Sequence, residues 1–148
     1  MGVMIEGVDL YPLRIIDVPK GNILHALRSY DEGFCGFGEA YFSSIEYGEV
    51  KGWTRHTRMP LNIVVPHGAI RFVIYDDRPD SPTKGCFEDI VLSPADNYRR
   101  LYLEPGLWMA FMGVGEGTSL LLDIIPAPHD PGESDKKPLD AIPYNFKP

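Results

Sequence analysis

The stretch that decides the fold is Val50-Lys51-Gly52-Trp53-Thr54-Arg55-His56-Thr57. Its β-branched and aromatic residues favour a strand, and side chains along a strand alternate between its two faces. Thr54 and His56 are therefore expected on one face, with Trp53, Arg55 and Thr57 on the other. If the first face lines a cavity, His56 is a candidate functional group. If it lines an ordinary core, His56 is a hydrogen-bonded interior histidine.

Strand-like segments flank this stretch on both sides. Short apolar, aromatic and β-branched runs are separated by turns rich in Gly, Pro, Asn and Asp. They lie at 23–28, 38–47, 61–65, 70–75, 87–92, 98–103, 107–112 and 119–125, with an edge strand or extended arm within 1–19. The chain has 15 Gly and 14 Pro, a density of breakers that long helices do not tolerate. The pattern predicts an all-β antiparallel sandwich or barrel.

Composition limits the class of protein. A chain of 148 residues with 44% hydrophobic and 24% charged residues is typical of a soluble globular protein. We expect a single domain over 1–148, with the loop-like segment 126–148 as a C-terminal arm packed on it and held by Ile142, Tyr144 and Phe146. The net charge of -7, without a lysine- or arginine-rich run, argues against binding to nucleic acid or to an anionic membrane.

Location and redox state are also expected from the sequence. We recognise neither a signal peptide nor an apolar run long enough to cross a bilayer, so a cytoplasmic protein is expected. Cys35 and Cys86 form no metal-type or redox-type spacing. They are expected to be free thiols.

Several landmarks follow one another along the chain in the order of a known family. They are Asp17 with Lys20-Gly21, Lys51-Gly52-Trp53, Asp77-Arg78 followed by Ser81-Pro82-Thr83-Lys84-Gly85, Pro105-Gly106-Leu107-Trp108, and Asp130-Pro131 with Glu133. Together they resemble the dTDP-4-dehydrorhamnose 3,5-epimerase superfamily over residues 17–144. The resemblance implies a cupin jelly-roll barrel, a homodimer with strands or arms contributed across the interface, and a nucleotide-linked sugar as ligand.

The resemblance also implies where catalytic groups stand. The family's Arg-Gly-apolar-His motif, whose histidine removes a proton next to the sugar ketone, reads Lys51-Gly52-Trp53-Thr54 here. Related ketoisomerases carry a second histidine two residues later, and His56 matches it. The family's lysine near the ketone, its later histidine and its tyrosine acid align in turn with Leu61, Met109 and Asp123. The aspartate that orients the base has no secure counterpart, and Asp140 is near the expected place in sequence.

The reaction needs a base and an acid or oxyanion stabiliser for the developing enolate. His56 suits the base because imidazole titrates near neutrality. Asp123 alternates with apolar residues of its strand, and a carboxyl group in an apolar site can stay protonated and act as an acid. The structural alternative for Asp123 is a carboxylate at a strand end, hydrated or bonded to backbone.

Other polar and aromatic residues are candidate ligands of the substrate. A diphosphate could be bound by the basic side chains around the central strands, Lys51, Arg55, Arg58 and Arg71, and Thr54 is a further candidate ligand of the substrate. The alternative is that these charges simply alternate on a solvated strand face. The resemblance implies anion contacts at Lys20 and Lys51, where the family has arginines. Tyr41 belongs to a set of aromatic residues that could stack a nucleotide base or be core and interface residues. Thr54-Arg55-His56 supplies one histidine of the pair in a cupin metal site, so we expect no metal and no other cofactor.

The resemblance therefore implies an isomerase or epimerase of nucleotide-linked 4-keto-6-deoxy sugars in surface polysaccharide biosynthesis, and His56 is the residue expected to act as base. The alternative is a non-catalytic sugar-nucleotide-binding cupin that has lost the epimerase catalytic set. Thr54, Leu61 and Met109 favour that alternative, and His56 opposes it.

Overall fold

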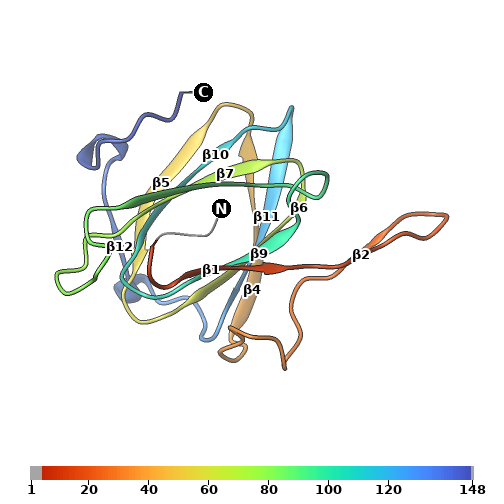
Figure 1. The fold of residues 1–148 in the computed structure, drawn as a ribbon, viewed down its shortest axis with the longest axis horizontal. Helices are drawn as coiled ribbons and strands as arrows, with labels where there is room; N and C mark the ends of the chain where they lie inside the picture. Colours follow the sequence, from red (N-terminus) through yellow and green to blue (C-terminus); the bar gives the residue numbers. More distant parts are fainter. Residues whose placement is uncertain (1–4, 148) are drawn as a thin grey trace.

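Two five-stranded antiparallel sheets pack face to face in the computed structural model, which describes residues 5–147 (Figure 1). The first sheet runs in the order β1 (Val8–Pro12), β9 (Arg99–Leu103), β6 (Leu61–His67), β11 (Thr118–Ile125) and β4 (Glu39–Glu46). The second runs β12 (Ser134–Lys136), β5 (Val50–His56), β10 (Trp108–Gly113), β7 (Ile70–Tyr75) and β8 (Phe87–Leu92). This double-sheet architecture confirms the all-β, cupin jelly-roll prediction.

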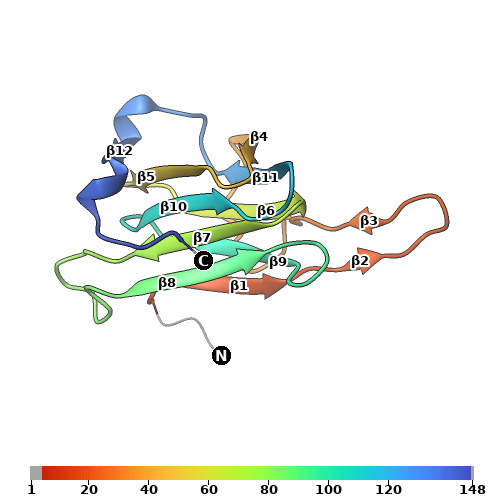
Figure 2. The same cartoon turned by 90° about the horizontal axis from the view of Figure 1, so that it is seen from above.

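Elements outside the two sheets are short. β2 (Ile15–Ile16) and β3 (Ile23–Leu24) form a hairpin that projects from the body of the molecule (Figure 2). Two 3-10 turns, η1 (Pro131–Glu133) and η2 (Leu139–Ala141), flank β12 near the C-terminus. Across residues 5–147 there is no α-helix.

Two sequence-based strand boundaries need correction. The strand expected at 23–28 is limited to β3, because only Ile23 and Leu24 pair with β2. The strand expected at 61–65 continues to His67, and Pro66 lies where the register against β11 shifts between Leu120 and Leu122. A bulge accepts a proline because that residue need not donate to the ladder.

Both ends of the chain contain more regular structure than the sequence predicted. The edge strand or arm within 1–19 is β1 followed by β2, although residues 1–4 lie outside the described range. The segment 126–148 was expected to be loop-like, and it contains η1, β12 and η2; Pro148 lies outside the described range. β12 forms because it pairs with the free edge of β5.

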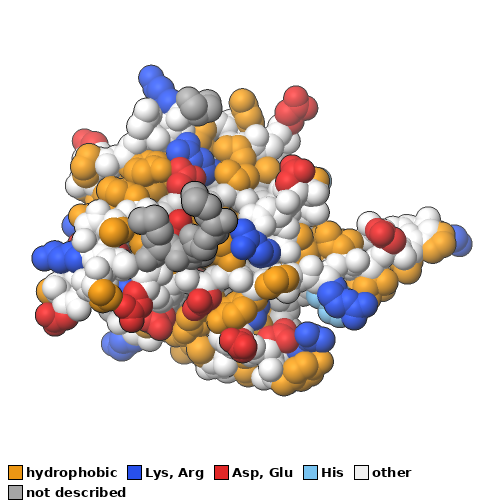
Figure 3. Space-filling model, viewed as in Figure 1, with side chains coloured by type: hydrophobic (Ala, Val, Ile, Leu, Met, Phe, Trp, Pro, Cys, Tyr) orange, Lys and Arg blue, Asp and Glu red, His pale blue; other side chains and the backbone are white. Residues whose placement is uncertain are grey.

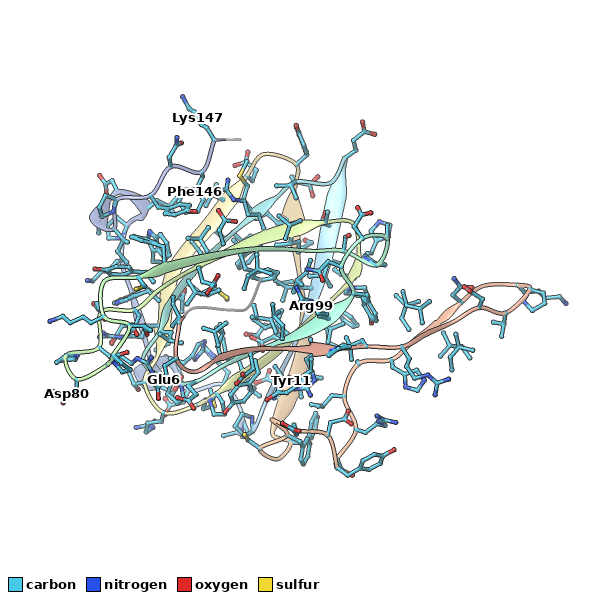
Figure 4. The ribbon with its side chains drawn as sticks, in the orientation of Figure 1. Glu6, Tyr11, Asp80, Arg99, Phe146 and Lys147 are labelled. Carbon is cyan, nitrogen blue, oxygen red and sulfur yellow. The ribbon has the colours of Figure 1, made fainter. Side chains whose placement is uncertain are left out.

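Two apolar clusters hold the fold. The main one lies between the sheets and includes Ile63, Phe72 and Leu101, each fully buried. The second lies on the outer face of β5, β7 and β10, where the C-terminal arm covers the two tryptophans; its residues include Trp53, Trp108, Ile142, Tyr144 and Phe146. Figure 4 labels Phe146 near the end of this arm. The ring centroid of Phe146 lies 5.8 Å from that of Trp53. The arm therefore completes the second cluster.

Candidate active site

A cavity of about 120 Å³ lies between the two sheets next to β5. Its apolar lining is Met59, Leu61, Ile63, Leu103, Leu107, Met109, Phe111 and Leu121. Its polar lining is Tyr41, Ser43, Thr54, His56, Glu104 and Asp123. An apolar hollow with a few convergent polar groups is the usual form of a small-molecule site. The predicted alternation of β5 holds, since the face that carries Thr54 and His56 lines this cavity.

Gly52 allows β5 to approach β10 closely beside the cavity. Its φ is +146°, and a Cβ placed there would lie 2.5 Å from the side chain of Ala110. The register between the two strands shifts at the same place, between Met109 and Phe111. A glycine is required at a position with both constraints, and this local geometry sets the positions of Thr54 and His56 further along β5.

His56 is held by a buried carboxylate. Its Nδ1 lies 2.6 Å from Glu133 Oε1, and Glu133 Oε2 accepts the backbone N–H groups of Arg58 and Met59, each at 2.8 Å. Burial pushes the pKa of Glu133 upward, but these hydrogen bonds and His56 outweigh it and hold the pKa below its ordinary value. An ionised Glu133 fixes the proton of neutral His56 on Nδ1 and leaves Nε2 as the basic nitrogen.

Sequence reasoning missed the role of Glu133. It was noted only as a landmark after Asp130-Pro131, while Asp140 was considered for orienting the base; Asp140 lies exposed in η2. The contact with His56 depends on the pairing of β12 with β5, which places Ser134 opposite His56. A segment without strand alternation gave no signal for this pairing.

Asp123 is the second polar group of interest in the cavity. It is 4% exposed, and its Oδ2 accepts the hydroxyl of Tyr41 at 2.9 Å. Its Oδ1 is buried without a hydrogen-bond partner. Burial raises the pKa of Asp123 to about 6, against the opposing effects of the Tyr41 hydroxyl and of His56. Sequence reasoning placed Asp123 among the candidates but did not pair Tyr41 with it.

Four positions that depart from the family's catalytic residues meet in this cavity. Thr54, Leu61, Met109 and Asp123 each contribute to its lining, although they come from four different strands. Leu61 and Met109 therefore make the lining of the cavity more apolar than a lysine and a histidine would. His56 with Glu133, and Asp123 with Tyr41, supply the proton-carrying groups that remain.

The predicted anion ligands are distributed differently. Arg55 lies on the outer face of β5, 2.7 Å from Asp135 and stacked over Trp108. Arg71 lies on the outer face of β7, where it pairs with Asp89 at 2.6 Å and donates to the carbonyl of Phe146. The structure does not bring these two arginines to the cavity of their own chain.

Arg58 and Lys20 also lie away from the cavity lining. Arg58 is exposed and pairs with Asp130 at 3.4 Å. Lys20 is exposed in the turn of the projecting β2–β3 hairpin. For Arg55, Arg58, Arg71 and Lys20, a contact with ligand stays a prediction.

Lys51 lies in a groove that continues from the cavity. Thr54, Met109 and Phe111 line both, and the groove is further lined by Lys51, Lys136 and Lys137. Lys51 Nζ donates to the carbonyl of Ser44 at 2.6 Å. Lys136 lies on β12 directly opposite Thr54, and directly opposed residues share one face of a sheet, so Lys136 is on the cavity side of this edge strand. Sequence reasoning missed Lys136 because it read this segment as loop.

Metal and membrane features are absent from the described chain. No group of three or more His, Cys, Asp or Glu within residues 5–147 is placed to hold a metal ion. No helix in that range is long and apolar enough to span a membrane. Cys35 and Cys86 are free thiols, as expected.

Comparison with known proteins identifies relatives of the whole chain. No model of a known protein family matches the chain. A solved structure described as a dTDP sugar isomerase from Desulfovibrio desulfuricans is 39% identical, with a TM-score of 0.94, over 98% of this chain and 94% of that one. The probable low-salt glycan biosynthesis epimerase Agl13 of Haloferax volcanii is 29% identical over 95% of this chain and 89% of its own length.

Two further matches are more distant in sequence. A spore coat polysaccharide biosynthesis protein of Bacillus subtilis, SpsL, is 26% identical over 90% of this chain and 88% of its own length. A 3'-monoepimerase from Streptomyces bikiniensis, solved with dTDP, is 22% identical with a TM-score of 0.82, over 95% of this chain and 75% of that one. With the fold, the motif order and the 39% identical structure in agreement, the chain belongs to the dTDP-4-dehydrorhamnose 3,5-epimerase superfamily of sugar-nucleotide isomerases and epimerases.

Proposed function

We propose that this protein is an isomerase or epimerase of a nucleotide-linked 4-keto-6-deoxy sugar, with His56 as the base that removes a proton next to the ketone. The observation that carries the proposal is the His56–Glu133 contact of 2.6 Å at the wall of the cavity. A histidine oriented by a buried carboxylate, with its other nitrogen free, is a suitable general base near neutral pH.

The reaction begins when His56 Nε2 takes a proton from the carbon next to the ketone. The electron pair of that C–H bond forms the carbon–carbon double bond of an enolate, and the former carbonyl oxygen takes the negative charge. Asp123, in its protonated form, is the acid that returns a proton. The apolar surroundings that raise the pKa of Asp123 to about 6 keep part of it protonated near neutrality.

The nucleotide end of the ligand is proposed to lie in the adjoining groove. Lys51 and Lys136 flank the point where the groove meets the cavity, next to Thr54. A diphosphate there would have two ammonium groups in reach, while the sugar would enter the cavity. The match with structures of dTDP-sugar proteins supports dTDP as the nucleotide.

The projecting β2–β3 hairpin bears on the assembly of the protein. The β2–β3 hairpin leaves Ile23 and Val18 exposed, and Figure 3 shows it standing away from the body with hydrophobic side chains along it. A hairpin with exposed apolar side chains fits a homodimer in which it packs on a second copy of the chain. Lys20, in the turn of this hairpin, would then lie next to the second copy. We propose that 1–148 acts as one domain with 126–148 as its arm, in the cytoplasm, in surface polysaccharide biosynthesis. The glycan and spore coat relatives support that setting.

A second candidate is a non-catalytic protein that binds the same ligand. The observation that favours it is the set Thr54, Leu61 and Met109, which places apolar or neutral groups where the family has a base, a lysine and a histidine. The ordered His56–Glu133 pair favours the enzyme, because a binding module has no need of an oriented imidazole.

The test is a deuterium wash-in experiment. The protein is incubated in heavy water with a dTDP-4-keto-6-deoxy sugar, and exchange at the carbons next to the ketone is followed by NMR. We expect exchange well above a protein-free control. Binding of dTDP by calorimetry without any exchange of a keto sugar would instead establish the non-catalytic candidate.

A further inference from the structure

Tyr41 and Asp123 form a pair on neighbouring strands of one sheet. β4 and β11 are in register with Tyr41 directly opposite Asp123, and the Tyr41 hydroxyl donates to Asp123 Oδ2 at 2.9 Å. Both side chains line the cavity, and Asp123 Oδ1 is buried without a partner. The phenol thus fixes one carboxyl oxygen and leaves the other for whatever occupies the cavity. A buried polar atom left without a partner is costly unless a ligand satisfies it.

His56 approaches the same cavity from the other sheet. It lies on β5, in the sheet β12-β5-β10-β7-β8, whereas Tyr41 and Asp123 lie on β4 and β11 of the sheet β1-β9-β6-β11-β4. The base and the acid of the proposed reaction therefore stand on opposite walls. A sugar between them presents one face to His56 and the other to Asp123.

We propose that Tyr41 is a positioning residue that holds Asp123 so that Oδ1 returns the proton from the wall opposite His56, which makes the reaction an epimerisation at the carbon that His56 deprotonates. This inference rests on the proposed function and narrows it. A shift of the ketone to a neighbouring carbon returns the proton to a different atom, and one base on one wall suffices for that.

The proton balance is complete without another reactant. His56 Nε2 takes the proton from one face of the carbon and becomes an imidazolium. The Asp123 Oδ1–H bond breaks, the enolate electrons form a new C–H bond on the opposite face, and the ketone re-forms. Asp123 is left as a carboxylate that accepts the Tyr41 hydroxyl, and exchange of protons with water restores both groups.

The charges around Asp123 determine how Tyr41 acts. Tyr41 faces it from β4, His56 faces it across the cavity with Glu133 behind, and Glu104 lines the same cavity from the β9–β10 turn. A hydroxyl donated to the carboxylate favours its ionised form, so it lowers the pKa that burial raises. Removing the hydroxyl should raise the pKa of Asp123.

The test compares Tyr41→Phe with Tyr47→Phe, an exposed tyrosine just after the same strand. The first readout is ¹³C NMR titration of the Asp123 carboxyl, assigned with Asp123→Asn, in protein without ligand. We expect its pKa to rise by about one unit in Tyr41→Phe, the size of one hydrogen bond to a charged group, and to stay unchanged in Tyr47→Phe. Equal pKa values in wild type and Tyr41→Phe would overturn the positioning role.

The second readout is the pH–rate profile of epimerisation. Asp123 must start protonated, so activity falls as pH rises through its pKa, and this alkaline limb should move up by the same amount in Tyr41→Phe. A ketone-shifted product, or proton return to the face from which it left, would overturn the opposite-wall assignment. If the wild type exchanges no proton with any keto sugar, the proposed function fails, while the carboxyl titration still decides the role of Tyr41.

Discussion

The two faces of β5 differ in how their polar groups are satisfied. On the outer face, the Trp53 indole donates to the carbonyl of Leu139 at 3.2 Å, and Arg55 pairs with Asp135 at 2.7 Å. On the inner face, His56 and Thr54 line a cavity in which Asp123 Oδ1 has no partner. Buried polar groups are almost always paired when their role is structural.

This difference indicates that the polar residues of the outer face stabilise the fold, whereas those of the inner face are placed to contact a ligand. The arm covers the outer face, and its own side chains and carbonyls complete the contacts there. On the inner face, His56 and Asp123 line a cavity of about 120 Å³. Substitutions on the outer face should therefore change stability, and substitutions on the inner face should change chemistry.

Glu133→Gln should give the largest effect among the supporting residues. The amide oxygen would be kept by the N–H groups of Arg58 and Met59, so its NH₂ would face His56 Nδ1. That arrangement puts the imidazole proton on Nε2 and removes the base. A carboxylate-to-amide change of this kind lowers kcat by about 10⁴-fold in a serine protease, and we expect about 10³-fold or more here. The measurement is steady-state deuterium exchange.

The matched control for Glu133→Gln is Asp135→Asn. Asp135 is also on the β12 segment but pairs with Arg55 on the outer face. The Asp135→Asn variant should exchange deuterium at a rate near that of the wild type. A loss of less than about tenfold in Glu133→Gln would show that the buried carboxylate does not set the tautomer of His56.

Trp53→Ala should give the largest loss of stability. The side chain is fully buried between β5 and the C-terminal arm, and removing a buried tryptophan costs about 3–5 kcal/mol. Urea unfolding of Trp53→Ala and of Phe42→Ala, whose side chain is mostly exposed on β4, gives the comparison. Equal midpoints for the two variants would refute a structural outer face.

Asp123 should make stability depend on pH in an unusual direction. Its pKa rises from 3.8 to about 6 on folding, so the native state binds more protons than the unfolded state between these values. Below this window Asp123 costs nothing, and above it the buried charge costs about 3 kcal/mol. The wild type should therefore lose about that much stability relative to Asp123→Asn between pH 4 and pH 7. Parallel stability curves for the two proteins would contradict the buried, charge-disfavouring site.

Arg71→Ala should have the smallest effect of this set. It removes an ion pair with Asp89 and a hydrogen bond to the Phe146 carbonyl, both near the surface. We expect a loss of about 1–2 kcal/mol and faster hydrogen exchange in the arm, with deuterium exchange of the substrate unchanged. If substrate affinity falls instead, Arg71 is an anion ligand as the sequence suggested, and the division between the two faces is incomplete.

Alternation along strands was the most informative feature of the sequence. It placed Thr54 and His56 together, put Trp53 and Arg55 on the opposite face, and located Asp123 in an apolar strand; the structure has all of these positions. These are local properties, set by a repeat of two residues within one strand.

Pairing between distant segments could not be read in the same way. Glu133 reaches His56 only because β12 adds to the edge of β5, and Tyr41 reaches Asp123 only because of the register of β4 against β11. Arg55 and Arg71 found carboxylates on neighbouring strands, which no motif in the sequence indicated. The contacts that orient His56 and Asp123 could therefore be found only from the three-dimensional structure.

The measurement that tests the central claim most directly is deuterium wash-in by His56→Asn, with dTDP affinity measured on the same sample. Asparagine can still donate to Glu133 but cannot take a proton from carbon. We predict exchange at least 10²-fold slower than in the wild type, with dTDP affinity nearly unchanged. Exchange at the wild-type rate in His56→Asn would contradict the assignment of the inner face of β5 as the catalytic face.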